Sequence, residues 1–308
     1  MNDAAALRCI GRFAPSPTGP LHFGSLIAAL ASYADARARQ GQWLLRIEDL
    51  DPPREHPGAA ESFPRVLEYF GFTWDGPILR QSRRHDAYES ALAQLAERGK
   101  VFPCACSRLD LESSATGIGG ERVYPGTCRQ GLLPGRSPRA WRMRVGNEPV
   151  DFVDRLQGAQ QQVLARDVGD FVVKRADGFW GYQLAVVVDD AAQGVTDVVR
   201  GADLLASTPR QIWLQRELGL PQPHYLHVPV AINSDGEKLS KQTLARPLPM
   251  SDPLPVLINA WRFLDQAWQG EEFANVREFW EWAIPRWDVR RLPPVAMLTA
   301  RTGKAGGL

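Results

Sequence analysis

Two short motifs, far apart in the chain, contain residue types that can hold a nucleotide. The first is APSPTGPLHFGS at residues 14–25, where a turn-rich run leads into a helical pattern that begins at His22. A helix N-terminus offers free backbone N–H groups and the positive end of the dipole, so it suits an anion. His22 can donate to a phosphate oxygen, and Gly24 lets a ligand come close to the backbone. An ordinary turn that starts a helix contains the same residue types.

The second motif is EKLSKQ at residues 237–242, on a loop expected after a strand. Lys238 and Lys241 carry mobile ammonium groups, which suit the charge that grows on a triphosphate in a transition state. A charged surface turn has the same composition, so this motif alone does not identify a nucleotide site.

Three of the four cysteines, Cys104, Cys106 and Cys128, form a cluster in the sequence. A reducing cytoplasm favours a metal site over disulfides for such a cluster. Three thiolates suit Zn²⁺, and a structural zinc site takes four ligands. No histidine lies in this region, so Tyr124 is the best fourth donor. Three reduced, buried thiols without metal are the alternative.

Strands and helices alternate around the motifs. Residues 7–13 and 42–49 are expected to be strands, and the helix between them should stop at Gly41. This order is a βαβ unit, so we predict an α/β fold with a Rossmann-type parallel sheet. Further helices are expected near residues 57–70 and 82–99.

Length and composition fit a globular protein of about two domains. The chain has 308 residues and a net charge of +1, which excludes binding of nucleic acid through a global basic field. The N-terminus lacks the pattern of a secretory signal, and the apolar stretches are too short to span a bilayer. We therefore expect a cytoplasmic protein without a membrane partner.

Taken together, the two motifs resemble the HIGH and KMSKS motifs of the class I aminoacyl-tRNA synthetases, here HFGS at 22–25 and KLSKQ at 238–242. The segments RFAPSPTGPLHFGSL at 12–26, RIEDLD at 46–51 and LAVVVDDAAQGVTDVVRGADLL at 184–205 are similar to the glutamyl branch of that family. The resemblance covers about residues 7–245. It implies activation of glutamate with ATP and Mg²⁺.

The sequence departs from a full glutamyl-tRNA synthetase in three places. Only about 60 residues follow Gln242, too few for a large anticodon-binding region. Ala202, Asp203 and Leu204 follow Arg200–Gly201, where that family has an acidic residue, Asp and His. The second motif ends in glutamine rather than serine or arginine.

These departures match a short branch of the family, the glutamyl-queuosine tRNA(Asp) synthetases. Membership would imply tRNA-independent activation of L-glutamate and its transfer to the cyclopentenediol of queuosine at the wobble position of tRNA(Asp). The alternative is a truncated glutamyl-tRNA synthetase that charges the terminal ribose of tRNA. A catalytically inactive binding module and a small-molecule nucleotidyltransferase are two further alternatives. The intact HFGS and KLSKQ motifs disfavour an inactive binding module. A nucleotidyltransferase is disfavoured by four residues that suit glutamate: Arg12, Glu48, Tyr182 and Arg200.

Glutamate has two carboxylates and an ammonium, so its site needs arginine forks and an acceptor. The resemblance implies a glutamate site formed by Arg12, Phe13, Ala14, Pro15, Ser16, Glu48, Tyr182 and Arg200. It implies an ATP site formed by His22, Gly24, Ser25, Lys238, Leu239, Ser240 and Lys241, with His22, Lys238 and Lys241 catalytic. Without the resemblance, Arg200 would be interpreted as a surface ion pair and Tyr182 as a core aromatic.

For the cysteine cluster, the resemblance implies a structural Zn²⁺ held by Cys104, Cys106, Tyr124 and Cys128. Four arginines follow, which either contact RNA phosphates or form a solvated strand face: Arg136, Arg139, Arg142 and Arg144.

The expected organisation has four segments. Residues 1–100 are the first half of the catalytic domain, and 101–165 an inserted zinc-type domain that contacts the acceptor. Residues 166–245 are the second half with the KMSKS-like loop, and 246–308 a short helical C-terminal region without an anticodon-binding domain. We expect a monomer whose partners are L-glutamate, ATP and queuosine-containing tRNA(Asp).

Overall fold

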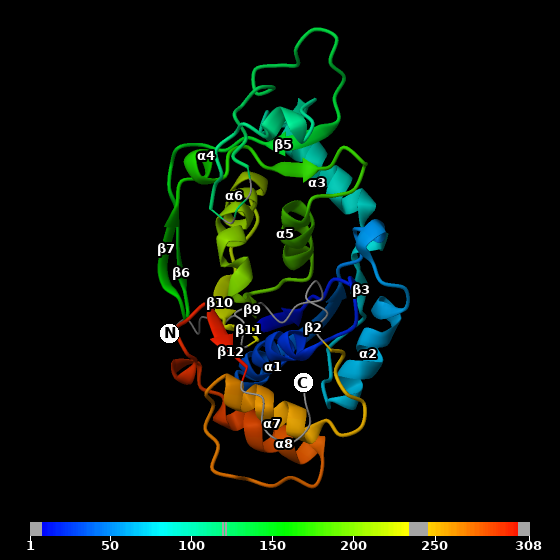
Figure 1. The fold of residues 1–308 in the computed structure, drawn as a ribbon, viewed down its shortest axis with the longest axis vertical. Coiled ribbons are helices and arrows are strands. Elements are labelled where there is room, and N and C mark those ends of the chain that lie inside the picture. The colour runs from blue at the N-terminus through cyan, green and yellow to red at the C-terminus, as the bar shows by residue number, and fades with distance from the viewer. Residues whose placement is uncertain (1–7, 119, 121, 234–245, 301–308) are drawn as a thin grey trace, which may run out of the picture.

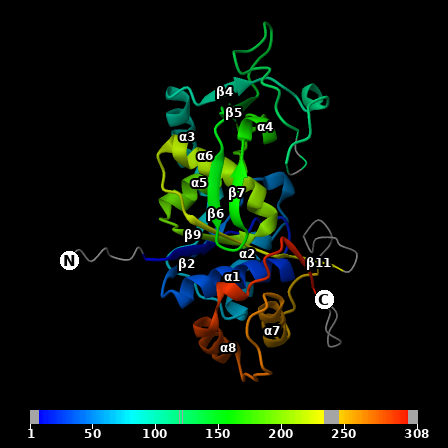
Figure 2. The same cartoon turned by 90° about the vertical axis from the view of Figure 1, so that its left-hand side faces the viewer.

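The computed structural model describes residues 8–118, 120, 122–233 and 246–300. This part of the chain is elongated. Figure 1 places β5 and the loops around it at one end of the long axis and helices α7 and α8 at the other, and Figure 2 shows the same order from the side. No helix within the described ranges is long and apolar enough to cross a membrane.

Parallel strands at the centre confirm the predicted α/β class. One set pairs in the order β1 (Ile10–Phe13), β2 (Gln42–Ile47) and β3 (Leu79–Arg80). A second set contains β9 (Asp197–Gly201) and β10 (His224–Val228), also parallel. The backbone N–H of Thr196 donates to the carbonyl of Ile10 at 3.0 Å, so β9 lies beside β1.

Helices pack on both sides of these strands and build two apolar cores. The first core contains α1 (Phe23–Ala38), α2 (Ala59–Tyr69), α7 (Leu254–Phe263) and α8 (Val276–Ala283). The second contains α3 (His85–Glu97), α5 (Tyr182–Ala192) and α6 (Thr208–Leu218). A 3₁₀ turn, Ala202–Ser207, leads from β9 into α6. Helices on both faces are what a buried parallel sheet requires.

The segment predicted as an insert contributes to two different sheets. One is antiparallel and contains β4 (Val101–Cys104), β5 (Ala140–Met143) and β8 (Val172–Lys174). The hairpin of β6 (Val150–Asp154) and β7 (Gly158–Gln162) instead joins the central strands, because β6 pairs with β10. A single turn of helix, α4 (Leu164–Asp167), follows the hairpin.

The C-terminal region contains the predicted helices and one strand that the sequence pattern did not indicate. Strand β12 (Met297–Thr299) pairs in parallel with β11 (Val230–Ile232). Trp280 of α8 donates its indole N–H to the carbonyl of Phe70 at 3.0 Å. The region is therefore attached to the rest of the chain both by strand pairing and by helix packing.

Candidate active site

A cavity of about 680 Å³ opens at the carboxyl ends of β1, β2, β9 and β10. Open α/β sheets bind their ligands at this edge. Its lining includes all the predicted glutamate residues and three residues of the predicted ATP set: Arg12, Phe13, Ala14, Pro15, Ser16, Glu48, Tyr182 and Arg200, with His22, Gly24 and Ser25. The remaining predicted ATP residues, Lys238, Leu239, Ser240 and Lys241, lie outside the described residues.

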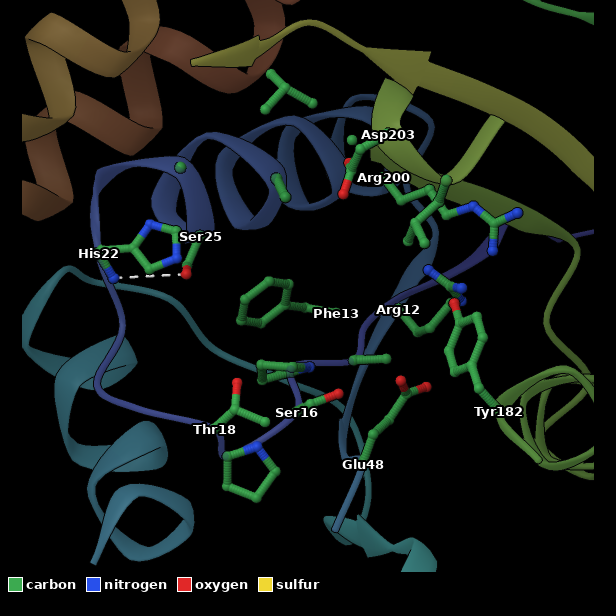
Figure 3. A pocket seen from close by; sticks show the side chains of 18 of the residues that line it. Arg12, Phe13, Ser16, Thr18, His22, Ser25, Glu48, Tyr182, Arg200 and Asp203 are labelled. Atoms are coloured by element: carbon green, nitrogen blue, oxygen red, sulfur yellow. Dashed lines mark hydrogen bonds between the residues drawn. The ribbon is translucent and has the colours of Figure 1, made fainter. Parts of the chain in front are cut away.

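The first motif forms one side of the cavity. His22 is the N-cap of α1, and its backbone N–H donates to Ser25 Oγ at 3.4 Å. The first backbone hydrogen bond of the helix runs from the Leu26 N–H to the His22 carbonyl at 3.0 Å. Figure 3 shows His22 and Ser25 on one side of the cavity and Arg12, Glu48, Tyr182 and Arg200 on the other. The helix N-terminus and the charged residues therefore face one shared space.

Four charged side chains form a buried network on the side of the cavity opposite His22. Arg12 Nε lies 3.1 Å from Asp190 Oδ1, and Arg46 Nη2 lies 2.8 Å from the same oxygen. Arg46 Nη2 also lies 3.3 Å from Glu48 Oε1. Asp190 thus bridges two arginines, and one of them holds Glu48. Buried charges persist when they are paired in this way.

The network moves the pKa values of its two carboxyl groups in opposite directions. Burial raises the pKa of Glu48, and the positive charges of Arg46 and Arg12 only partly oppose that effect. Burial also acts to raise the pKa of Asp190, but Arg12 and Arg46 outweigh it, and the pKa lies below its usual value. Asp190 is therefore the ionised partner of Arg12 and Arg46. An added positive charge, such as an ammonium, would stabilise the ionised form of Glu48.

Arg200 has an interior position, with 5% of its surface exposed, so it is not the surface ion pair that was the alternative. Its Nε donates to His227 Nε2 at 3.0 Å, and its Nη2 donates to Thr208 Oγ1 and Gln211 Oε1 at 2.9 and 2.8 Å. Nη1 is buried and has no hydrogen-bond partner among the described residues. A carboxylate bound in the cavity would supply the missing acceptor.

Tyr182 is the first residue of α5 and lines the cavity near Arg200, Glu48 and Arg12. Burial raises the pKa of its phenol, so the hydroxyl keeps its proton and can donate to a carboxylate. This position favours the predicted contact over a purely structural aromatic.

The cysteine cluster assembles as its sequence spacing predicted. The sulfur atoms of Cys104, Cys106 and Cys128 lie within 4.8 Å of one another. Tyr124 Oη lies 3.5 Å from Cys104 Sγ and 3.8 Å from Cys106 Sγ, and it accepts the Cys128 backbone N–H at 2.7 Å. Three sulfurs and one phenol oxygen at these distances fit the donor set of a four-coordinate zinc ion.

Arg142 neither contacts solvent on an open strand face nor is free to reach a phosphate. It is buried, its Nε donates to Cys104 Sγ at 3.3 Å, and its guanidinium lies 3.9 Å from the centre of the Tyr124 ring. Arg142 therefore contacts two of the four predicted zinc donors, Cys104 and Tyr124. Of the three other arginines, Arg136 forms an ion pair with Asp110, and Arg144 lies over the Phe102 ring.

The residues that support the site from behind were not predicted from the sequence. They are chiefly Arg46, Asp190, His227 and Asp154. One signal was available, because Arg46 and Glu48 are two positions apart in an extended segment and so share a face. A charged residue there, within the otherwise apolar run WLLRI, indicates a buried partner. No comparable spacing links Asp190 or Asp154 to the site, since their partners come from distant elements.

Residues 9–248 match the family described as tRNA synthetases class I (E and Q), catalytic domain. The chain belongs to this family, which confirms the class predicted from the paired motifs.

Two curated relatives identify the branch, and both are named glutamyl-Q tRNA(Asp) synthetase. The relative from Aromatoleum aromaticum is 56% identical, over 95% of this chain and 93% of its own. The relative from Dechloromonas aromatica is 55% identical, over 94% and 97%. The resemblance to the short branch is thus confirmed.

A solved structure agrees with the fold. A glutamate tRNA ligase from Elizabethkingia meningosepticum, in complex with its amino acid, has a TM-score of 0.78 against this chain. It is 22% identical, and the match covers 96% of this chain and 67% of that one. At this identity the likeness supports the arrangement of the elements and no more.

Proposed function

We propose that this protein activates L-glutamate with ATP in the absence of tRNA and transfers it to the cyclopentenediol of queuosine in tRNA(Asp). The observation that carries the proposal is the cavity, where Arg12, Arg200, Tyr182 and Glu48 converge opposite the N-terminus of α1. The names of relatives more than half identical to this chain point to the same acceptor.

In the first step, an oxygen of the glutamate α-carboxylate attacks the α-phosphorus of ATP. A new C–O–P linkage forms, the bond to the bridging β-phosphate oxygen breaks, and pyrophosphate leaves. Positioning and charge stabilisation dominate such a displacement.

The residues of the cavity would divide the substrate groups between them. Arg12 and Arg200 would hold the carboxylates of glutamate, Glu48 would accept from its ammonium, and Tyr182 would donate to a carboxylate oxygen. His22 and the helix N-terminus would bind phosphate oxygens, and Lys241 with Lys238 the departing pyrophosphate. Mg²⁺ accompanies ATP as its counter-ion.

In the second step, one hydroxyl of a cis-diol attacks the carbonyl carbon of glutamyl-adenylate. An ester forms, the carbonyl–oxygen bond to AMP breaks, and the hydroxyl proton leaves with the solvent or the AMP phosphate. A terminal ribose and the cyclopentene ring of queuosine present the same vicinal hydroxyls. The same centre can therefore serve either acceptor, and the docked RNA decides between them.

We further propose the four segments 1–100, 101–165, 166–245 and 246–308 as the functional division of the chain. The second would be held by a structural Zn²⁺ on Cys104, Cys106, Tyr124 and Cys128, supported by their proximity and by Arg142. That ion would fix the loops that meet the RNA acceptor and would take no part in activation.

The experiment begins with glutamate-dependent ATP–pyrophosphate exchange without RNA, which the proposal requires. Two tRNA(Asp) preparations then serve as acceptors, one with queuosine and one with unmodified guanine, each ending in 2′,3′-dideoxyadenosine. Periodate cannot replace this terminal block, because it cleaves both cis-diols. We expect labelled glutamate only in the queuosine-bearing RNA, and after nuclease digestion only in its anticodon fragment.

Incorporation that ignores queuosine, or that needs an intact terminal ribose, would instead identify a truncated enzyme that charges tRNA. Absence of exchange with the wild-type chain would refute the activation step itself.

A further inference from the structure

Two buried side chains stand directly behind Arg200 and have no role in the reaction described so far. Asp154 is the last residue of β6, and His227 lies in the neighbouring strand β10. His227 Nδ1 and Asp154 Oδ2 are 2.6 Å apart, and both side chains are 0% exposed. His227 Nε2 faces Arg200 Nε at 3.0 Å.

The directions of these hydrogen bonds are fixed by the chemistry of arginine. A guanidinium only donates, so His227 Nε2 must be an acceptor and carry no proton. The single proton of the neutral ring is then on Nδ1 and is donated to Asp154. Burial, the largest influence, lowers the pKa of His227 to about 4, so the ring is neutral near pH 7.

Asp154 is itself held in place. Its Oδ1 accepts the backbone N–H groups of Leu156 and Gln157 at 3.0 and 2.9 Å, in the turn that leads to β7. Its Oδ2 accepts the Nδ1 proton of His227 at 2.6 Å. The β6–β7 turn therefore fixes the carboxylate, and the carboxylate fixes the tautomer of the ring.

The consequence for Arg200 is a defined orientation of its fork. Nε is used by His227, and Nη2 by Thr208 and Gln211, all buried. Nη1 remains, is buried, and belongs to a residue that lines the cavity. If the ring presented N–H instead of a lone pair, Nε2 and Arg200 Nε would be two donors 3.0 Å apart, and the ring proton could be accepted only by Thr208 Oγ1 at 3.2 Å. The bond that orients the Arg200 guanidinium would then be lost.

We propose that Asp154 and His227 are positioning residues that hold the Arg200 guanidinium in its carboxylate-binding orientation by fixing the Nδ1-protonated tautomer of the ring. The proposal rests on the proposed function, because it assigns Arg200 to glutamate. It places the specificity of the cavity partly in the β6–β7 hairpin, outside the residues that touch substrate.

The sharpest test is Asp154→Asn. The amide oxygen can keep the two turn bonds, while the amide N–H₂ takes the place of Oδ2 and can only donate. The ring must then accept at Nδ1 and carry its proton on Nε2, toward Arg200. We expect the KM for glutamate to rise roughly 10- to 100-fold in ATP–pyrophosphate exchange, with the KM for ATP within about 2-fold of wild type.

A matched pair at the ring separates positioning from packing. In His227→Gln the side chain can reach the Nε2 position and offer an oxygen to Arg200. In His227→Asn it can reach only the Nδ1 position and pair with Asp154. We expect the glutamine variant to keep a glutamate KM within about 5-fold of wild type and the asparagine variant to lose more than about 10-fold. Equal effects of the two variants would overturn the proposal.

Asp35→Asn is the control for loss of a buried carboxylate. Asp35 is 2% exposed and paired with Arg155 and Arg39, and it does not line the cavity. We expect its glutamate KM to stay at the wild-type value whatever its effect on melting temperature.

Nitrogen-15 spectra of the ring give an independent readout. Wild type should show His227 protonated on Nδ1, and Asp154→Asn should show the proton on Nε2. A wild-type ring protonated on Nε2, or an unchanged glutamate KM in Asp154→Asn, would overturn the positioning role. If Asp154→Asn does not fold, the wild-type spectrum and the His227 pair decide. Absence of exchange by wild type would instead refute the proposed function.

Discussion

The cavity and the cysteine cluster both bring polar side chains into the interior, but they balance charge in opposite ways. In the cavity, positive and negative groups already meet: Asp190 lies between Arg12 and Arg46, and Arg46 also holds Glu48. In the cluster, three thiols and a phenol lie together with Arg142 as their cationic neighbour. In the first arrangement each buried carboxyl group already has an arginine partner, whereas the second has the composition of a site that a cation completes.

This difference separates the two regions by what they require before they function. A network of paired charges can hold side chains ready for substrate at no further expense of ordering. A cluster of similar donors gains its stability from the metal, and its order then depends on metal supply. The two regions should therefore respond differently to substitution, to pH and to chelation.

The largest effect is expected from removing the central arginine of the cavity. Arg46→Met leaves Asp190 and Glu48 with less compensation in the interior, and Arg46 is fully buried. Loss of one partner from a buried pair destabilises a protein by about 3–5 kcal/mol. Urea unfolding of the variant should show a loss of that size.

The exposed pair Arg277–Glu281 supplies the control, with side chains 86% and 62% exposed. Arg277→Met should leave the free energy of unfolding close to the wild-type value, because an exposed ion pair contributes little. Equal losses in the two variants would show that burial of the network does not matter.

The next effect concerns substrate choice. Glutamine replaces one carboxylate by an amide and would leave an arginine of the cavity without its anionic partner. Such a loss costs about 2–5 kcal/mol, so glutamine should be activated at least ~10²-fold less efficiently than glutamate. The ratio of kcat/KM values in ATP–pyrophosphate exchange measures it. Equal efficiencies for the two amino acids would remove Arg12 and Arg200 from the roles given to them.

A smaller effect is expected from pH. The pKa of His227 is lowered from 6.5 to about 4 in the folded state. The unfolded chain therefore binds a proton that the folded chain excludes, and stability is lost as pH falls from 6.5 toward 4. Between pH 7 and pH 5 the loss should be about 2 kcal/mol at 1.4 kcal/mol per pH unit.

His227→Gln serves as the reference, because it lacks this group and keeps every other titrating residue, including Glu48. Unfolding in urea at pH 7, 6 and 5 should give a shallower pH dependence for the variant than for wild type. Parallel curves would contradict a neutral, buried ring.

The smallest effect is expected on activation when metal is removed. Chelation, or Cys128→Ser, should abolish bound zinc, which metal analysis would measure as a fall from about one ion per chain to none. The rate of glutamate-dependent ATP–pyrophosphate exchange should change by less than about 3-fold, because the buried carboxyl groups of the cavity are paired with arginines and not with the metal. Transfer to RNA should fall much further. Loss of ATP–pyrophosphate exchange on chelation would show that the cavity depends on the metal and would contradict the independence of the two regions.

Much of the site could be predicted because its residues follow local rules. The Pro/Gly run before His22, and the position of Glu48 after a strand, place both at the carboxyl edge of a parallel sheet. The cluster of Cys104, Cys106 and Cys128 was visible in the spacing alone. Family resemblance supplied Tyr182 and Arg200, whose roles no local pattern defines.

What could not be predicted depends on contacts between distant elements. Asp190 meets Arg12 and Arg46 only after α5 packs beside the sheet, and Asp154 meets His227 only because β6 pairs with β10. For Arg142 the sequence left phosphate contact and a solvated strand face as alternatives, because alternation along a strand does not show what covers it. Strand β12 is three residues long, too short for any period to appear in the sequence.

The pairing of β12 with β11 also has a consequence for the order in which the molecule is made. Val230 and Ala231 of β11 line the cavity, and their partners are Met297 and Leu298. A ribosome adds about 5–20 residues per second, so roughly 3–13 s separate the synthesis of Ala231 from that of Met297. During that interval the cavity wall has an unpaired outer strand. Among the described strands, β12 is therefore synthesised last, and it pairs with a strand that already lines the cavity.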